Sequence, residues 1–281
     1  MSSLASAQVA QPATILLSAG RHWWTVTLAT AVAFLRRTNA YVIDIIRWPI
    51  FPLISFAVWR IGYDIAGRGT VDGASASAFL LVGMIGQITW TATVWGGGYA
   101  VEYEREGGTI GALFLSPASR TAVVTGYGLG SLVWMLPAFI SVTILGVATG
   151  ARLNVADPLA ALAALLALII TSLGTGFLCA SLFVLTRRAN LVANTVQLPV
   201  SLLAGFLVPR TDLPGWLQPI SDAVPAGHAV DALRASALNG ASFGDIVRPL
   251  VWALGLAVLY ALLGFAGLRR IEHAAKRSGQ L

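Results

Sequence analysis

Six long apolar stretches dominate the chain, and they restrict its fold more than any other feature of the sequence. Each is long enough to cross about 30 Å of hydrocarbon as a helix, which takes roughly 17 to 25 residues. A backbone in lipid must satisfy its own polar groups, and runs without the two-residue alternation of barrel strands do so as helices. We therefore expect an all-α integral membrane protein with six transmembrane helices. The spans are 45–65, 78–100, 121–150, 158–185, 191–208 and 249–268.

The scarcity of charge supports this interpretation. Of the 281 residues, 57% are hydrophobic and only 11% are charged, whereas a soluble domain averages about 25% charged residues. The net charge of +6 is compatible with nucleic-acid binding, but the cations lie at the ends of the apolar stretches, as membrane topology requires. We therefore expect membrane lipid around the chain and no nucleic-acid partner.

The distribution of Lys and Arg predicts the orientation in the membrane. With six spans, both termini lie on one side, and most of the 18 Lys and Arg residues lie on that side. Such residues concentrate in cytoplasmic segments, so we expect a multi-pass protein of the plasma or inner membrane with cytoplasmic N- and C-termini. The cations assigned to the outer side are Arg60, Arg68, Arg152, Arg210, Arg234 and Arg248.

The segment before the first span divides into two parts. Residues 1–20 contain no Lys or Arg and do not resemble a signal peptide, so we expect a disordered cytoplasmic tail. The uncharged stretch between Arg21 and Arg36 is too short to cross comfortably, and Trp23 and Trp24 suit the headgroup boundary. The domains expected after the tail are a cytoplasmic interfacial helix at 21–44, the transmembrane domain at 45–268 and a basic cytoplasmic tail at 269–281.

The spans lack the chemistry of an enzyme or an ion-coupled carrier. Their centres hold no Asp, Glu, Lys, Arg or His, and His22, His228 and His273 are far apart and outside the spans. Ion-coupled carriers need ionisable groups at mid-membrane, and hydrolases or metal enzymes need clustered side chains. We therefore expect a non-catalytic subunit without a metal site, although a sodium site built from carbonyls would leave no such pattern. Arg60 and Asp64, four residues apart, are expected to pair.

The chain also has no P-loop with which to bind ATP. A Walker A loop places a lysine after a glycine-rich turn so that the amine reaches the phosphates. Lys276 is the only lysine, and no glycine-rich turn precedes it. Energy from ATP must therefore come through another chain, and we expect no cofactor in this one.

A dense charge cluster follows the second span. Four of the five residues at 102–106 are charged, and such a cluster cannot face lipid. Thr109 can cap a short helix that ends before Ser116 and Pro117, since proline interrupts a helix. An ordinary solvated loop would show the same spacing, so these residues alone leave a loop and a partner-binding element equally open.

Two patterns resemble the ABC-2 type permeases, including drug-resistance exporters of the daunorubicin class. The first is E-x-E-R-E-x-G-T…S-P-x-S-R at 102–120, and the second is LPGWL…P…DALR at 213–234. Their order along the chain is similar to that of the family over nearly the whole length. The resemblance implies two separate ATPase subunits that carry ATP and Mg, a second permease that is identical or paralogous, and short outer re-entrant helices between spans five and six.

The resemblance also assigns roles to particular residues. The stretch at 110–112 departs from the family's commoner pattern, which carries another acidic residue there. The expected ATPase-coupling residues are Glu102, Glu104, Arg105, Glu106, Gly108, Thr109, Ser116, Pro117 and Arg120. The expected outer re-entrant residues are Leu213, Pro214, Gly215, Trp216, Asp231 and Arg234.

In the family, the second and fifth spans line the dimer axis, and here both carry uncharged polar groups. The expected translocation path comprises Gln87, Thr89, Trp90, Thr91, Trp95, Asn194, Gln197 and Ser201. Polar groups in lipid also serve as helix–helix contacts, and Gly126 and Gly130 suggest close packing. The uncharged path favours export of an amphiphilic or hydrophobic drug, antibiotic or lipid. Export of a lipid-linked polysaccharide, or an ATPase-independent scaffold or flippase, is the alternative.

The expected orientation can be tested by labelling. With Cys179→Ser as background, Glu106→Cys should react with an impermeant maleimide in inside-out vesicles and not in intact cells. Labelling of residue 106 from outside would contradict both the orientation and the coupling role.

Overall fold

The structure is a computed structural model that describes residues 19–38, 42–109, 118–185 and 189–278. Almost every element is helical. The exception among the described residues is a β-hairpin whose strands have two residues each, β1 (Thr70–Val71) and β2 (Ala74–Ser75). The helices are α1 (Ala19–Thr38), α2 (Val42–Ile65), α3 (Ala76–Thr93), the π-helix η1 (Val94–Gly98), α4 (Ala100–Glu106), α6 (Arg120–Trp134), α7 (Leu136–Ala148), α8 (Pro158–Leu185), α9 (Ala189–Leu203), the 3-10 helix η2 (Arg210–Asp212), α10 (Gln218–Asp222), α11 (Pro225–Leu238) and α12 (Phe243–Ser278).

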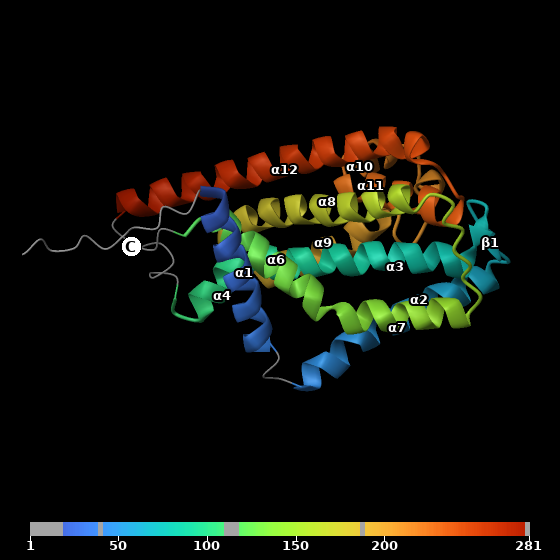
Figure 1. Cartoon of the computed structure of the whole chain (residues 1–281), viewed down its shortest axis with the longest axis horizontal. Helices are drawn as coiled ribbons and strands as arrows, with labels where there is room; N and C mark the ends of the chain where they lie inside the picture. Colours follow the sequence, from blue (N-terminus) through green and yellow to red (C-terminus); the bar gives the residue numbers. More distant parts are fainter. Residues whose placement is uncertain (1–18, 39–41, 110–117, 186–188, 279–281) are drawn as a thin grey trace, which may run out of the picture.

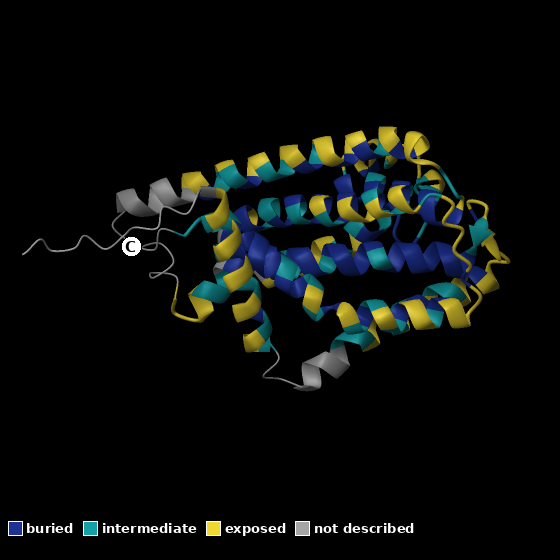
Figure 2. Ribbon diagram, viewed as in Figure 1, coloured by how far each residue is buried: buried dark blue, intermediate teal, exposed yellow. Residues whose placement is uncertain are grey.

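The long helices α3, α8 and α12 lie side by side along the long axis of the bundle (Figure 1). Helix α3 is the central one. Protein buries 83% of the most apolar 18-residue stretch of the span Ala76–Gly98, which α3 forms with η1. Helices α7 and α12 instead expose one face along much of their length (Figure 2). Helix α1 runs across one end of the bundle and packs on α6 (Figure 1).

Among the residues that the structure describes, three helices are long and apolar enough to cross a membrane. They are Ala76–Gly98, Pro158–Phe183 and Phe243–Arg270, and the pair α6 and α7 adds a fourth if it is a single bent span. Within the described ranges, α2 and α9 do not meet this condition. The structure therefore supports a multi-pass helical protein with three or four such helices, and six spans remain a prediction.

The expectation of one unbroken helix over 121–150 is wrong. The chain bends by 42° between α6 and α7. Pro137 lies in the first turn of α7, and a proline there cannot donate a backbone hydrogen bond to the preceding turn. The break therefore has a local cause that was already present in the sequence.

The fifth span is expected over 191–208, and its predicted end is also wrong, because α9 stops at Leu203. Gly205 adopts a left-handed φ of 72°, its N–H donates to Leu202 O at 3.0 Å, and Phe206 N–H donates to Ser201 O at 3.1 Å. These two bonds form a Schellman motif, which ends a helix most readily at glycine. The following residues up to Val208 are non-helical.

The other boundaries agree more closely with the sequence. Helix α8 has the expected bounds, and the Arg60–Asp64 pair is confirmed. Helix α12 begins before the expected residue 249, because the Ser242 N–H donates to the Asp245 side chain at 3.0 Å and its hydroxyl donates at 2.7 Å. The Asp245 carboxylate accepts both bonds and so satisfies the N–H of the residue that precedes the helix, which stabilises the first turn.

Glycines bring the helices into close contact. A Cβ on Gly126 would lie 2.5 Å from Thr27 O of α1, and a Cβ on Gly130 would lie 3.0 Å from Ala31 O. The expected close packing at this pair is therefore confirmed. A Cβ on Gly264 of α12 would lie 2.5 Å from the carbonyl of Phe177 of α8, so this pair of long helices also meets backbone to backbone.

This packing predicts a difference between two glycines of α12. Gly264→Ala should lower stability by about 1–3 kcal/mol because the methyl group overlaps the α8 backbone. Gly255→Ala is the control, since no atom outside its own helix lies within 4 Å of a Cβ there, and it should leave stability unchanged or slightly higher. Thermal unfolding in detergent measures both, and an equal effect of the two changes would contradict this packing.

Candidate functional site

A cleft of about 460 Å³ opens between α2, α3 and α9. Aromatic rings and uncharged polar groups form its walls, and none of the described lining residues is charged. The lining comprises Trp48, Phe51, Pro52, Ser55, Met84, Gln87, Ile88, Thr91, Trp95, Tyr103, Met135, Asn194 and Gln197.

A short chain of hydrogen bonds joins two walls of the cleft. Trp95 Nε1 donates to Gln197 Oε1 at 3.3 Å, and Gln197 Nε2 donates to Thr91 Oγ1 at 3.5 Å. Gln197 thereby connects α9 to α3 and η1. One turn before Thr91 on α3, the buried Gln87 Oε1 has no hydrogen-bond partner among the described residues.

The structure brings five of the eight expected path residues into this cleft: Gln87, Thr91, Trp95, Asn194 and Gln197. The other three lie outside the lining. Thr89 Oγ1 donates to Ile85 O at 2.7 Å and Ser201 Oγ donates to Gln197 O at 2.8 Å, both within one helix. Trp90 is buried in the core. For these three residues, contacts within the helix or the protein core account for where the side chain lies, without a role in the cleft.

Sequence reasoning missed the wall that α2 supplies. Trp48, Phe51, Pro52 and Ser55 line the cleft from this helix. Aromatic residues beside two prolines, Pro49 and Pro52, were visible in the sequence, but only the packing of α2 against α3 and α7 shows which of them face inward.

The charge cluster after the second span forms α4. Arg105 pairs with Glu102 at 2.6 Å, and both Arg105 and Glu106 are exposed. Glu104 has a different environment, because its Oε1 accepts from Tyr127 OH at 2.6 Å and its other carboxylate oxygen accepts from the Thr109 hydroxyl. Glu104 therefore anchors α4 to α6.

The chain leaves α4 in a turn. Gly108 has a left-handed φ of 69°, and Thr109 N–H donates to Glu104 O at 2.9 Å. Thr109 thus terminates α4. The predicted helix after Thr109, together with Ser116 and Pro117, lies outside the described residues, and Arg120 is the first residue of α6.

Tyr103 belongs both to α4 and to the cleft. Its ring stacks on Tyr127 of α6 at 5.7 Å between centroids and lies 6.1 Å from the ring of Tyr99, which stacks on Trp95 at 4.9 Å. Contiguous aromatic rings therefore run from the cleft wall into α4.

Arg37 of α1 approaches Tyr103 from the other side, donating to its carbonyl at 3.5 Å. Burial raises the pKa of the Tyr103 phenol, nearby Glu106 raises the pKa further, and Arg37 opposes both. A phenol is already protonated at physiological pH at its ordinary pKa of about 10, and the raised pKa acts in the same direction, so Tyr103 presents a neutral surface to the cleft.

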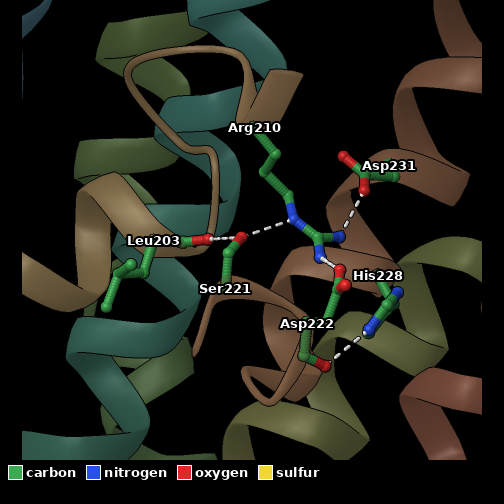
Figure 3. A network of polar contacts seen from close by, with 6 residues as sticks. All are labelled: Leu203, Arg210, Ser221, Asp222, His228 and Asp231. Atoms are coloured by element: carbon green, nitrogen blue, oxygen red, sulfur yellow. Dashed lines mark hydrogen bonds and ion pairs between the residues drawn. The ribbon is translucent and has the colours of Figure 1, made fainter. Parts of the chain in front are cut away.

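The segment between α9 and α12, expected on the outer side, is organised around Arg210 (Figure 3). Arg210 donates to Ser221 Oγ at 2.8 Å and to Asp231 at 2.7 Å, and it also pairs with Asp222. Ser221 Oγ donates in turn to Leu203 O at 2.6 Å. The guanidinium thereby joins the end of α9 to η2, α10 and α11.

The remaining expected residues of this segment fall into two environments. Helix α11 is largely buried against α3, α8 and α12, and the guanidinium of its Arg234 lies 3.6 Å from the centroid of the Phe79 ring and donates to Phe206 O at 3.2 Å. Leu213, Pro214, Gly215 and Trp216 instead form the loop before α10, where Trp216 is 72% exposed.

Comparison with known proteins gives consistent matches. Residues 8–238 match the sequence profile of the ABC-2 type transporter family. Daunorubicin resistance ABC transporter permease protein DrrB1 of Streptomyces coeruleorubidus is 25% identical over 245 residues, covering 86% of this chain and 82% of that protein. The probable multidrug ABC transporter permease YbhR of Escherichia coli K12 is 28% identical over 178 residues, covering 63% and 48%.

A shorter match points the same way. The probable doxorubicin resistance ABC transporter permease protein DrrC of Mycobacterium tuberculosis H37Rv is 36% identical over 64 residues, which is 23% of each chain.

The Glu104 anchor predicts how α4 responds to loss of one hydroxyl. Tyr127→Phe should speed amide hydrogen exchange across 100–109 by about three- to tenfold, since one hydrogen bond to a carboxylate is worth roughly 1 kcal/mol or more. Tyr260→Phe is the control, because it removes a 3.0 Å bond to Ala223 O in the outer segment. Unchanged exchange in α4 after Tyr127→Phe would contradict the anchoring role.

Proposed function

Because this chain belongs to the ABC-2 type transporter family, we propose that it exports an amphiphilic or hydrophobic drug, antibiotic or lipid. In this proposal, it is the non-catalytic transmembrane permease of an ATP-driven exporter. The drug class follows the names of the relatives, two of which are called resistance permeases for daunorubicin or doxorubicin.

The character of the cleft is the observation that supports this cargo class. Aromatic side chains such as Trp48, Phe51 and Trp95 offer large apolar surfaces, and Gln87 and Asn194 add neutral hydrogen-bonding groups. An ion would find no opposite charge among the described lining residues. An amphiphile gains from both kinds of wall.

The cleft also has a physical link to the proposed coupling element. Glu102, Arg105 and Glu106 present charge on α4, which suits a reversible contact specified by electrostatics. Tyr103 lies between two of these residues and forms part of the cleft wall. When a separate ATPase subunit closes on ATP and displaces α4, Tyr103 moves with it and reshapes the wall.

The assembly we propose has two ATPase subunits and a second permease, identical or paralogous. Helices α2 and α9 carry exposed apolar side chains such as Phe51, Ile54 and Leu198 beside the cleft, so a second permease can close it. The termini are placed in the cytoplasm, with α1 lying along the inner membrane surface. Its course across the end of the bundle supports the interfacial position of α1 (Figure 1).

Two alternatives differ in measurable ways. A lipid-linked polysaccharide exporter would transport such a lipid and not small amphiphiles into inside-out vesicles. A scaffold or ATPase-independent flippase would purify without an ATPase and work without ATP.

The coupling role of α4 predicts the effect of one charge reversal. Glu106→Lys should lower substrate-stimulated ATP hydrolysis by about tenfold, because like charge at a matched contact disfavours it by 1.4 kcal/mol or more. Expression and thermal stability should be unchanged, since Glu106 is exposed.

Arg152→Glu is the matched control, because Arg152 is an exposed charge in the loop between α7 and α8, distant along the bundle from α4 (Figure 1). Unimpaired hydrolysis and transport in Glu106→Lys would remove the coupling assignment. If the chain does not purify with any ATPase, that result would contradict the proposal that it is part of an ATP-driven exporter.

A further inference from the structure

A second cavity, of about 380 Å³, lies where α10 and α11 meet the start of α12. It is separate from the cleft and shares no lining residue with it. Asp222, His228, Arg248, Pro249 and Trp252 line it. The groups around it are charged and aromatic, and the proposed transport mechanism uses none of them.

Arg248 is an exposed cation on a membrane-crossing helix. It lies five residues into α12, or about 7 Å along the axis at 1.5 Å per residue, within the apolar stretch Phe243–Arg270. Val251 and Trp252, on the next turn, are 65% and 58% exposed. Within the part of the chain that the structure describes, Arg248 makes no hydrogen bond or ion pair. An exposed guanidinium without a partner in the described protein can bind an anionic group from outside the chain.

An excess of negative charge lies on the other side of the same cavity. Arg210 is bonded to both Asp222 and Asp231, so one cation faces two carboxylates. Asp222 is the more exposed of the two, with 67% of its side chain accessible against 43% for Asp231. Asp222 lines the cavity, whereas Asp231 does not.

The aromatic part of the cavity is held in position. His228 Nε2 lies 2.9 Å from Asp222 O, and since a carbonyl only accepts, this nitrogen donates (Figure 3). The imidazole stacks on Trp252 with 6.5 Å between centroids. Tryptophan at the end of a span is typical of the headgroup layer of a bilayer.

From this arrangement we propose that the cavity binds the phosphoethanolamine headgroup of a membrane phospholipid. The phosphate accepts from Arg248, and the ammonium donates to Asp222. The cation and the anion of the cavity thus each meet a group of opposite charge. The acyl chains follow the exposed apolar face of α12 beyond Val251. Trp252 packs against the headgroup between the two charges.

The two charges also explain selectivity among phospholipids. Phosphatidylglycerol has a phosphate for Arg248 but no cation for Asp222. Phosphatidylcholine has a cation, but its trimethylammonium has no N–H to donate to the carboxylate. A phosphoethanolamine lipid satisfies both ends.

Native mass spectrometry of the full chain, titrated with the three dioleoyl phospholipids, tests the proposal. The phosphatidylethanolamine should bind about tenfold more tightly than either of the others, the difference expected for one charge-assisted hydrogen bond. Arg248→Gln should lower its affinity about tenfold, and Arg248→Lys should retain most of it. Arg152→Gln, an exposed arginine of the loop between α7 and α8, is the control and should leave affinity unchanged.

A second pair of variants isolates the carboxylate. Asp222→Asn and Asp231→Asn each remove one negative charge paired with Arg210, but only the first should abolish the preference for phosphatidylethanolamine over phosphatidylglycerol. Thermal unfolding of both variants separates this effect from damage to the outer segment.

Several results would overturn the site. These are equal binding of all three lipids, equal effects of the two arginine or the two aspartate variants, or displacement of the lipid by inorganic phosphate alone. The last would identify a free-phosphate site. None of these results bears on the coupling role of α4, because Glu106 and this cavity lie in different parts of the bundle.

Discussion

Close backbone contact at glycine is the interaction on which this bundle depends. Lipid provides no hydrophobic force to bring helices together, so association rests on packing and hydrogen bonds. A Cβ on Gly83 of α3 would lie 1.8 Å from Phe206 O, and one on Gly86 would lie 2.6 Å from Val230 of α11. These contacts allow α11 and the chain before it to enter the bundle against α3. The burial of α11 against the central helix α3 follows from these contacts.

Placing α3 at the centre determines where the cleft and the coupling helix meet. Its C-terminal end continues as the glycine-rich π-helix η1, and a Cβ on Gly96 would lie 2.5 Å from Ser131 of α6. Helix α4 begins two residues after η1, so Tyr103 remains within reach of the cleft. A single continuous stretch of chain therefore carries path residues, a close contact with α6 and the charged surface of α4.

Parts of this arrangement were predictable from residues read singly or in short patterns. The bounds of α8, the Arg60–Asp64 pair and the end of the second apolar run at the charge cluster 102–106 follow from length, spacing and the exclusion of charge from lipid. Pro137 and Gly205 show the limit, because both lie within apolar runs that hydropathy alone extends through them. A left-handed glycine ends α9 only because Leu202 and Ser201 carbonyls accept the following N–H groups.

By itself, the sequence determined that this chain is helical, crosses a membrane and carries no P-loop, because the cost of bare backbone and charge in hydrocarbon depends on composition and run length. It did not determine which polar side chains share a surface. Gln197 lines the cleft, while the hydroxyl of Ser201, one turn later on the same helix, donates to the backbone carbonyl of Gln197. Only the tertiary packing decided this, since the direction of a side chain depends on the neighbouring helices. The same holds for Glu104, whose neighbours Arg105 and Glu106 are exposed while it is held by Tyr127.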